Sequence, residues 1–548
     1  MQANPSAKFP LTETVDFVIV GSGAAGGVVA KQLATRGHSV VVLEMGPRLG
    51  PSDFKHDEFS FWLNGDLGPK TPVTWRRTEK DRAQVGGGGV FRAAIVGGSS
   101  VHFTANYWRL HEIDFIERSR LGAIPGADLA DWPITYADLE PYYSMVDWEV
   151  GVSGEQGPFD PPRSRPFPMP PLPVKSSGVL FERGCKKLGL HSQPAPMAIL
   201  SRPHNGRNAC QHCGYCIGFG CEFGAKSSSL ASVIPVAEAT GKCEVRPLSY
   251  VRRVETDARG RATGVTYFDA DKREQFQPAR AVILSANGAE TPKLLLVSTS
   301  SQFPNGLANS SGYVGRHLMF NGNTGTMGLF EHPLNEHKSV QVTRIMHDFY
   351  DSDPKRGYYG GGGIDGRFQQ YPIAFGLGAL PPDSPRWGSA YKQMLAEYFT
   401  RTMMCAGHTT SLPVPGNSVT LDPTVKDDWG VPALRITYKD HDDDLKIMQF
   451  MVDRSKEILE AAEARKIWSF PVGVSGGTAH LLGTCRMGND PKTSVINVDH
   501  RTHDVPNLFL CDGSSMVTSG RGQPTMTIMA LAFRAGERIS DLAKRGEI

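Results

Sequence analysis

The clearest pattern of apolar positions lies in the N-terminal part of the chain. Val15–Val20 is an apolar run, interrupted only by Asp16 and rich in β-branched residues, which is typical of a buried strand. A glycine-rich turn follows, and the small residues over 27–36 predict a helix that ends at Gly37. Ser39–Leu43 is a second apolar run, and Glu44 follows it directly. This order of strand, turn, helix and strand is that of a nucleotide-binding β-α-β unit.

Similar patterns predict the later elements. Alternating positions between Cys243 and Pro278 predict β-strands, with a turn near Asp257–Gly260. The remaining expected elements are a buried strand at Ala281–Ala286, a helix from Thr291, mixed sheet and loop over 320–440, a helix at Asp443–Arg465, a strand at Asn507–Leu510 and a helix at Thr525–Ala543. We therefore expect an α/β fold in which a Rossmann-type domain is built from discontinuous segments and a second domain carries a mixed sheet.

Composition narrows the class of protein. The 548 residues are 40% hydrophobic and 21% charged, and 58 Lys and Arg against 56 Asp and Glu give a net charge of +2. This balance gives no basic field for nucleic acid. Met1–Thr14 lacks a basic region followed by an apolar one, and no run reaches the roughly 18 apolar residues of a membrane span. We expect a cytoplasmic protein without a transmembrane segment, or one that a partner subunit carries to the periplasm.

The glycine-rich turn has the spacing of a dinucleotide fingerprint. Gly21 permits a tight turn, Gly23 allows a pyrophosphate to approach the backbone, and Gly26 allows the helix to pack closely on the strand. Glu44, at the end of the second strand, is placed to hold a ribose hydroxyl. The fingerprint alone fits both FAD and NAD. Its place near the start of a long chain favours FAD, a permanent cofactor.

The cysteines point to a second kind of chemistry. Four of the nine fall in one short stretch, at Cys210, Cys213, Cys216 and Cys221. Such clustering favours a metal site over a disulfide framework spread along the chain. An iron–sulfur cluster fits short cysteine spacings, zinc also accepts four thiolates, and a loop without metal is the third alternative.

Further motifs resemble the glucose–methanol–choline (GMC) oxidoreductases. Val96–Thr104 is similar to the flavin-contacting loop of that family, especially in the branch that contains pyranose oxidase. Other similar segments, in the family's order, are Asn287–Pro292, Ala479–Gly488 around the catalytic histidine, Asn507–Ser514 and Gly522–Thr527. Within the family, the chain most resembles the large subunits of bacterial glucose, fructose and gluconate dehydrogenases, for example at Asp131–Ile134.

The resemblance implies an FAD-dependent enzyme that oxidises an alcohol, sugar or glycoside hydroxyl to a carbonyl, with hydride transfer to flavin N5 and electrons passed to an external acceptor. It implies that His480 is the catalytic base and that Gln523 bonds the reacting hydroxyl, where the family usually has His or Asn. His102 matches the position at which pyranose oxidase-like members attach flavin covalently, although in many relatives that region only packs against the ring. The further flavin contacts implied are Gly97, Gly98, Asp512, Gly513 and Thr525.

The resemblance also implies partners and a division of the chain. The related sugar dehydrogenases hold an iron–sulfur cluster in the cysteine region, with different spacing, and use a small subunit and a cytochrome acceptor. The expected segments are FAD-binding at 1–160, an excursion with the cysteines at 161–228, FAD-binding at 229–320, substrate-binding at 321–470, and FAD-binding with catalytic residues at 471–548.

Three rival functions stay open at this level. The first is a soluble oxidase that passes electrons to oxygen and uses the cysteines structurally. The second is a redox-silent lyase, because the family includes flavin-dependent hydroxynitrile lyases. The third is an NAD-dependent dehydrogenase, which the C-terminal flavin motifs disfavour.

Overall fold

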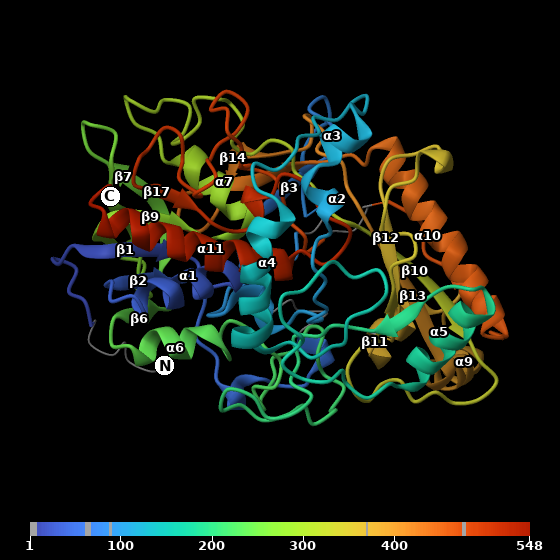
Figure 1. Ribbon diagram of the computed structural model, residues 1–548. Coiled ribbons are helices and arrows are strands. Elements are labelled where there is room, and N and C mark those ends of the chain that lie inside the picture. Colours follow the sequence, from blue (N-terminus) through green and yellow to red (C-terminus); the bar gives the residue numbers. More distant parts are fainter. Residues whose placement is uncertain (1–7, 61–66, 87–89, 369–370, 474–477) are drawn as a thin grey trace.

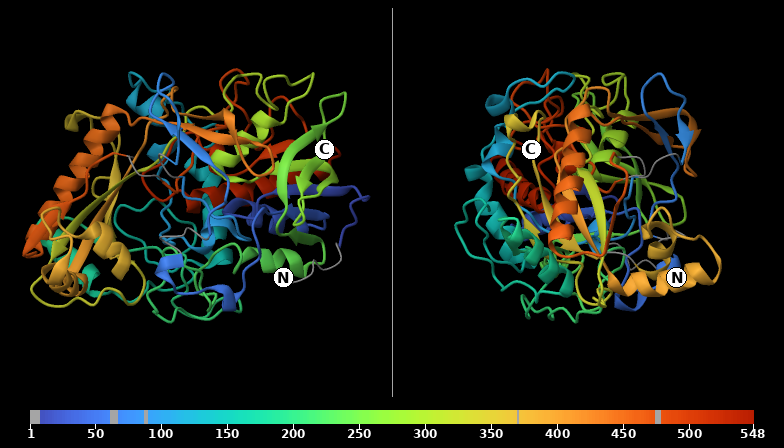
Figure 2. Two further views of the ribbon diagram at one scale, coloured as in Figure 1. Left: turned by 180° about the vertical axis from the view of Figure 1, so that it is seen from behind. Right: turned by 90° about the vertical axis from the view of Figure 1, so that its right-hand side faces the viewer.

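The computed structural model describes residues 8–60, 67–86, 90–368, 371–473 and 478–548, so residues 1–7 of the N-terminal segment lie outside the described part. The fold is α/β, as the sequence predicts. Figure 1 shows two sheet-containing halves side by side: both chain ends lie in one half, and the other carries β10 to β13 with α10 along its outer edge. Figure 2 shows the same arrangement from behind and from one side.

The first half is built on a sheet whose centre is parallel. β1 pairs in parallel with β2 on one side and with β9 on the other. Its parallel strands, in spatial order, are β6 (Cys243–Arg246), β2 (Val40–Leu43), β1 (Val15–Val20), β9 (Glu274–Leu284) and β17 (Leu508–Leu510). The expected discontinuity is therefore present, because strands from the start, middle and end of the chain share this sheet.

Three helices pack beside one another against this sheet: α1 (Ala24–Ala34), α6 (Val233–Ala239) and α11 (Thr525–Lys544). Small residues let α1 and α11 approach closely. A Cβ built at Gly536 of α11 would lie 2.5 Å from Cβ of Gln32 on α1. The predicted helix over 27–36 is thus present but begins at Ala24 and ends at Ala34.

β7 (Tyr250–Thr256) and β8 (Ala262–Phe268) extend the sheet in antiparallel fashion, on either side of the predicted turn. α7 (Asn287–Val297) follows β9 and begins four residues before the predicted Thr291. The Asn287 side chain is the reason, because its Oδ1 accepts hydrogen bonds from the backbone N–H groups of Ala289 and Glu290 and so closes the first turn.

The second half is a fully antiparallel six-stranded sheet. Its strands, in spatial order, are β16 (Lys466–Ser469), β10 (Gly322–Leu329), β13 (Thr402–Thr409), β12 (Gly362–Arg367), β11 (Val342–Met346) and β5 (Ser192–Pro194). α5 (Ser176–Lys187) and α10 (Asp442–Ala461) pack with Met403 and Cys405 of β13. Met404 and Ala406, with the opposite strand parity, belong to the cluster that packs against α9 (Gly388–Arg401).

The region 320–440 therefore holds more helix than the mixed sheet and loop that we predict from the sequence. No residue of α9 is fully buried, and the helix covers the sheet through half-buried side chains such as Tyr391, Met394 and Leu395. The sequence does carry a signal for this helix, because its half-buried side chains recur at the i, i+3, i+4, i+7, i+8 spacing of one helix face: Tyr391, Met394, Leu395, Tyr398 and Phe399.

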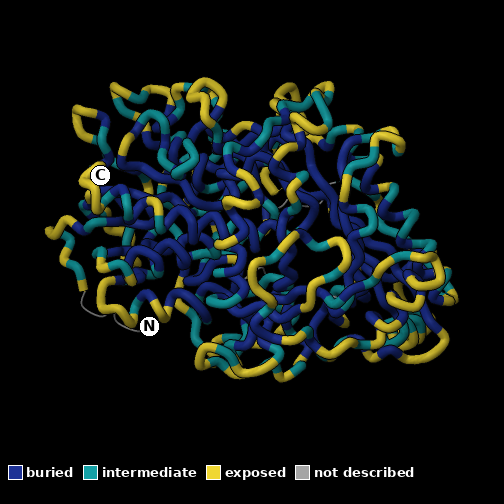
Figure 3. The backbone as a smooth tube through the Cα atoms, in the orientation of Figure 1, coloured by how far each residue is buried: buried dark blue, intermediate teal, exposed yellow. Residues whose placement is uncertain are grey.

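A small third sheet joins distant segments. It consists of β14 (Ser418–Lys426), β15 (Pro432–Thr437), β3 (Val73–Arg76) and β4 (Gln84–Val85), and β15 pairs with β3 in parallel. The shorter helices are α2 (Glu112–Phe115), α3 (Glu117–Leu121), α4 (Tyr136–Met145) and α8 (Pro372–Ala374). Figure 3 shows that the buried backbone is continuous between the two halves. Among the described residues, no helix is both long enough and apolar enough to cross a membrane.

Candidate active site

One large cavity, of about 910 Å³, runs from the N-terminus of α1 to the start of α11. This volume is in the range of cofactor-binding cavities. The predicted residues that line it are Gly21, Gly23, Glu44, Gly98, His102, His480, Asp512, Gly513, Gln523 and Thr525. Residues that are spread over the sequence from Gly21 to Thr525 therefore meet around one space. Gly26 and Gly97 belong to the same two turns but are not among the lining residues.

The nucleotide end of the cavity is the turn between β1 and α1. Gly21 has a φ of +93°, and a Cβ there would lie 2.5 Å from the carbonyl oxygen of Ser285. A Cβ on Gly26 would lie 1.9 Å from the Gly21 carbonyl oxygen, so this turn excludes any larger residue at both positions. No side chain caps the N-terminus of α1, and its first turn has no acidic residue. The N–H groups at such an uncapped helix end are of the kind that binds a phosphate anion.

Glu44 lies where the fingerprint places it, at the end of β2 and on the cavity wall. Its Oε2 accepts hydrogen bonds from the backbone N–H (3.0 Å) and the hydroxyl (2.7 Å) of Ser22. Burial raises the pKa of this carboxyl, and the bonds from Ser22 and Gly46 oppose that shift. The carboxyl group is therefore held rigidly beside the phosphate-binding turn.

The loop at Val96–Thr104, which we call the flavin-type loop, packs against the first turn of α1. Gly98 has a φ of +54°, and a Cβ there would lie 2.8 Å from the Cα atom of Gly23, so the two backbones are in contact. The Gly97 backbone N–H donates to the Ser22 hydroxyl over 3.0 Å. His102 follows with its Nδ1 3.2 Å from the Ser99 carbonyl oxygen, and burial lowers its pKa to about 3. A neutral imidazole thus stands at the cavity wall.

Asp512 connects the C-terminal motif to α7. Its Oδ2 accepts hydrogen bonds from the Asn287 backbone N–H (3.0 Å) and the Thr291 hydroxyl (2.5 Å), while Oδ1 accepts from the Ser514 N–H (2.8 Å). Burial raises the pKa of this carboxyl. Gly513 lies close to the segment that carries His480, because a Cβ on it would be 2.4 Å from the Leu481 carbonyl oxygen. Asp512 therefore fixes the turn that lies between α7 and that segment.

A second uncapped helix N-terminus faces the cavity where α11 begins at Thr525. The helix has 20 residues and no side-chain cap. The partial positive charge at this end favours a negative charge in the cavity beside it.

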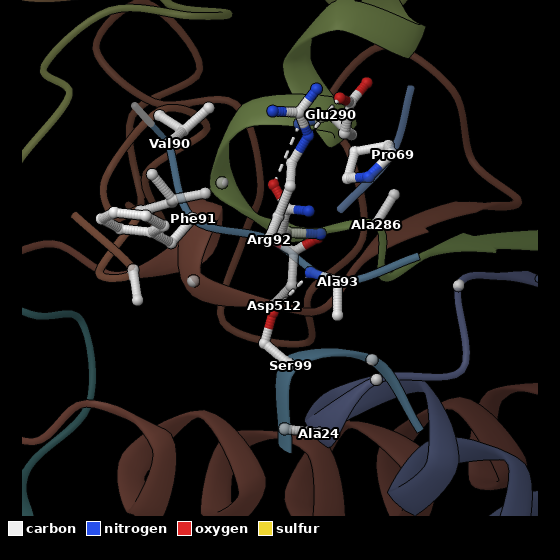
Figure 4. A pocket seen from close by; sticks show the side chains of 18 of the residues that line it. Ala24, Pro69, Val90, Phe91, Arg92, Ala93, Ser99, Ala286, Glu290 and Asp512 are labelled. Atoms are coloured by element: carbon white, nitrogen blue, oxygen red, sulfur yellow. Dashed lines mark hydrogen bonds and ion pairs between the residues drawn. The ribbon is translucent and has the colours of Figure 1, made fainter. Parts of the chain in front are cut away.

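An ion pair lies on another wall. Nε of Arg92 is 2.8 Å from Oε1 of Glu290 on α7, and Nη2 of Arg92 donates to the Thr71 hydroxyl. Figure 4 shows Arg92 and Glu290 on one side of the space and Ser99 and Ala24 on the opposite side, with Asp512 between them. The Arg92 charge is thus neutralised within the protein.

His480 also lines the cavity, in the segment that precedes Leu481 and Leu482. Burial, together with the nearby His408 and Arg367, lowers the pKa of its imidazole to about 3. The ring is therefore neutral at ordinary pH, which is the state that a general base requires.

The proton on His480 is placed by Asn321. Nδ1 of His480 lies 3.0 Å from Oδ1 of Asn321. The Asn321 amide nitrogen donates to the carbonyl oxygens of Thr409, Ser519 and Gly520 at 3.1–3.2 Å, so its oxygen must be the atom that faces the histidine. Nδ1 accordingly carries the proton and Nε2 carries the lone pair.

Gln523 lies beside a second histidine that the sequence motifs do not indicate. Its Nε2 is 3.3 Å from Nδ1 and 3.5 Å from Nε2 of His408. Asn106 lines the same part of the cavity. Asn321, His408 and Asn106 were missed because they lie outside the family motifs. Only Asn321 carries a signal in the sequence. It lies just before β10 and two residues from Asn323 within β10, so the two asparagines are on the same face of the strand.

The four clustered cysteines surround a separate small cavity of about 20 Å³, and Lys226 also lines it. Cys216 is buried and Cys213 is exposed. The Lys226 ammonium donates to the carbonyl oxygens of Cys216, Phe219 and Phe103, and the Gly218 N–H donates to the His102 carbonyl over 2.7 Å. The cysteine loop is thus tied directly to the flavin-type loop, and its Ile217 and Gly218 line the large cavity.

The four cysteine thiols are suitable ligands for a metal, but their side chains are not arranged to hold one. Four thiols around one space match the ligands of iron–sulfur or zinc sites. In the described ranges, however, no three or more His, Cys, Asp or Glu side chains are arranged to hold a metal ion. Burial raises the pKa of the Cys210 thiol to about 11 and that of the Cys216 thiol to about 12, so these two thiols are protonated at neutral pH.

The fold and the cavity together define a flavin-type dinucleotide-binding oxidoreductase, and comparison with known proteins agrees. Two GMC oxidoreductase models, N-terminal and C-terminal, match residues 15–320 and 413–532. The chain is 34% identical to 2-methyl-1,2-propanediol dehydrogenase of Mycolicibacterium austroafricanum, covering 96% of this chain and 95% of that protein. It is 31% identical to the fructose dehydrogenase large subunit of Gluconobacter japonicus, covering 98% and 99%.

Among solved structures, pyridoxine 4-oxidase from Mesorbium loti aligns with a TM-score of 0.62 at 17% identity, over 96% of this chain and 99% of that one. The chain belongs to the GMC oxidoreductase family, and membership of this family implies FAD.

Proposed function

We propose that the protein oxidises the hydroxyl group of a small alcohol, diol or sugar to a carbonyl, with His480 as base and Gln523 as the group that bonds the reacting oxygen. The observation that carries this proposal is the tautomer of His480. Asn321 holds the proton on Nδ1, and burial keeps the ring neutral, so Nε2 is available to accept the hydroxyl proton.

Different parts of the cavity suit different parts of an FAD molecule. The uncapped α1 terminus suits the pyrophosphate, Glu44 suits a ribose hydroxyl, and the α11 terminus suits the negative charge of a reduced ring. When bound, FAD supplies an N5 atom that accepts a hydride. The residues of this chain then have two tasks: His480 removes the hydroxyl proton, and Gln523 orients the oxygen so that the C–H bond is directed at the ring.

The names of the relatives narrow the substrate class. One relative acts on a small diol and another on a ketose, and both substrates carry hydroxyl groups on neighbouring carbons. The cavity wall that includes His480 and Gln523 also includes the polar side chains of Asn106 and Thr104. These groups suit a substrate with a further hydroxyl beside the reacting one, and we propose a 1,2-diol or sugar accordingly.

The experiment is an anaerobic titration of the purified protein. We expect flavin absorption in the visible range, and bleaching of that absorption when 1,2-diols or sugars are added. Protein that is folded but neither contains flavin nor binds added FAD would contradict the proposal. Repeating the turnover measurement with oxygen alone, and then with a dye as acceptor, distinguishes an oxidase from a dehydrogenase. We expect the dye to give the faster turnover.

His102 is the proposed point of covalent attachment to the flavin. It lines the cavity, its burial keeps the ring neutral, and its backbone contacts the cysteine loop. A neutral imidazole nitrogen is the form that can act as a nucleophile.

Cys210, Cys213, Cys216 and Cys221 are the proposed ligands of an iron–sulfur cluster. The loop that carries them reaches the flavin cavity through Ile217 and Gly218. A cluster held there supplies one-electron chemistry between a two-electron flavin and an external acceptor, such as a cytochrome with an accompanying small subunit. Metal and sulfide analysis of anaerobically prepared protein tests this proposal: iron with sulfide supports it, whereas stoichiometric zinc or no metal contradicts it.

A further inference from the structure

His408 lies at the centre of a buried polar cluster behind Gln523. It is on β13, directly opposite Asn323 of β10, and its neighbour on β12 is Gly363. Asp365 and Arg367 lie two and four residues further along β12, so they share one face of the sheet with His408. His408 is only 3% exposed.

Both ring nitrogens of His408 have partners in this cluster. Nδ1 lies 2.8 Å from Oδ1 of Asn323, and the Asn323 amide nitrogen donates to the Asn321 carbonyl over 3.1 Å. The Asn323 oxygen must therefore face the ring, and Nδ1 must be the donor. Nε2 lies 2.8 Å from Oδ2 of Asp365 and 2.9 Å from Nη2 of Arg367.

Asp365 and Arg367 also pair with each other. Because the Arg367 guanidinium already neutralises the Asp365 carboxylate, Nε2 of His408 faces a pair without net charge and accepts a hydrogen bond from Nη2 of Arg367. Burial lowers the pKa of His408, and Arg367 and His347 add to that effect, whereas Asp365 opposes it. His408 is thus a neutral ring held at both nitrogens.

The position of Gln523 relative to this ring follows from two distances. Its Nε2 is nearly equidistant from the two ring nitrogens, at 3.3 and 3.5 Å. An atom in the ring plane at those distances would collide with the carbon between the nitrogens, so the amide nitrogen lies over the ring face. Trp108 packs edge-on against His408, with ring centroids 5.2 Å apart, and supports the ring.

The reaction requires one particular end of the Gln523 amide. A hydroxyl group has a single proton, and in the proposed function that proton goes to Nε2 of His480. The second residue must then donate a hydrogen bond to the hydroxyl oxygen, because no second proton remains for it to accept. The face of a neutral aromatic ring attracts N–H groups and repels carbonyl oxygens.

We propose that His408 is a positioning residue, whose neutral ring selects the NH₂ end of Gln523 and so presents an N–H donor to the reacting oxygen. One N–H of Gln523 faces the ring and the other faces the cavity. Asn323, Asp365 and Arg367 act through His408 by fixing its ring. The inference rests on the proposed function, since it assumes that Gln523 bonds the substrate.

Two substitutions at His408 test the role of its ring face separately from the role of the hydrogen bonds made by its ring nitrogens. His408→Asn keeps a donor toward Asn323 but removes the ring face, and His408→Phe keeps the face but removes both nitrogens. We expect His408→Asn to slow the limiting rate of flavin reduction by about 10- to 100-fold, since a misoriented group costs about that much. We expect His408→Phe to lose less than about threefold, with the substrate dissociation constant changed little in either variant. The reverse order of the two variants would overturn the proposal.

A double-mutant cycle tests whether His408 acts through Gln523. If it does, His408→Asn combined with Gln523→Ala reduces flavin no more slowly than Gln523→Ala alone. Losses that multiply would overturn the proposal and make His408 a structural residue. Thr402→Val, at the far end of β13, is the control for a substitution in this strand and should match the wild-type rate of flavin reduction.

The same cycle separates this inference from the proposed function. If Gln523→Ala reduces flavin as fast as wild type, the role of Gln523 in the proposed function fails and the inference fails with it. If Gln523→Ala is slow but His408→Asn is not, only the inference fails.

Discussion

Nδ1 of His480 and Oδ1 of Asn321 are 3.0 Å apart, and this bond leaves Nε2 of the histidine as the basic atom. The histidine comes from the segment before α11, whereas the asparagine lies immediately before β10 in the other half of the molecule. The site is therefore assembled across the junction of the two halves, and the second half contributes the residue that sets the tautomer.

The first prediction concerns pH. His480 is active when neutral, and burial lowers its pKa to about 3, so the neutral form persists as the pH falls from 7 to 5. We expect the kcat/KM for flavin reduction to stay level over that range. A histidine of ordinary pKa, about 6.5, would instead lose about tenfold per pH unit below that value. A decline of that kind with an apparent pKa near 6.5 would contradict the assignment.

The second prediction concerns Asn321. Asn321→Asp keeps an acceptor for Nδ1 but adds a negative charge, which favours the protonated imidazole and raises the pKa of His480. Less neutral base is then present near neutral pH, so flavin reduction should slow on the acid side and recover as the pH rises. Asn417→Asp is the matched control, because the Asn417 side chain is also buried but bonds the backbone of Lys439 and not a histidine. An unchanged pH profile in Asn321→Asp would argue against control of His480 by this residue.

The third prediction concerns His102. If the flavin is bonded to it, acid precipitation of the protein leaves the yellow colour in the pellet, and His102→Ala releases the colour to the supernatant. The variant should still bind FAD, since the α1 turn and Glu44 are untouched. Colour found wholly in the supernatant of wild-type protein would rule out the bond.

The fourth prediction concerns Cys213. Cys213→Ser should leave flavin reduction by substrate at the wild-type rate but slow turnover with a large protein acceptor, because only the electron exit is altered. Small dyes that reach the flavin directly should be less affected. Cys405→Ser, which replaces a buried cysteine in β13, is the control for a thiol outside the loop. Equal turnover with the protein acceptor in the wild type and Cys213→Ser would assign the loop a structural role.

Much of the first half could be predicted from the sequence, because local rules determine it. A buried strand, a turn that only glycine permits at Gly21, a helix and a second strand that ends before Glu44 leave few alternatives. The cavity residues of the C-terminal motifs were likewise indicated by their resemblance to a family. The sequence places the start of α7 too late, because asparagine is as common in turns as at helix starts. In the structure the Asn287 side chain caps the first turn of the helix.

The contribution of the second half could not be predicted in this way. Asn321, His408 and Asp365 act through contacts between strands that are far apart in the chain, and the register of an antiparallel sheet is not written in any short motif. Each of these residues alone is more often a buried structural polar group than part of a site. Only the pairing of β10, β12 and β13 brings them behind Gln523.

The most direct test of the central claim is the anaerobic rate of flavin reduction in His480→Ala. Thermal unfolding and the visible spectrum should show that the variant is folded and retains flavin, because the cavity-lining residues of the α1 turn, Glu44 and Asp512 are unchanged. We predict that reduction by a substrate that bleaches the wild type slows by about 10²–10⁴-fold, the contribution of a positioned base. A His480→Ala protein that is reduced as fast as the wild type would contradict the account.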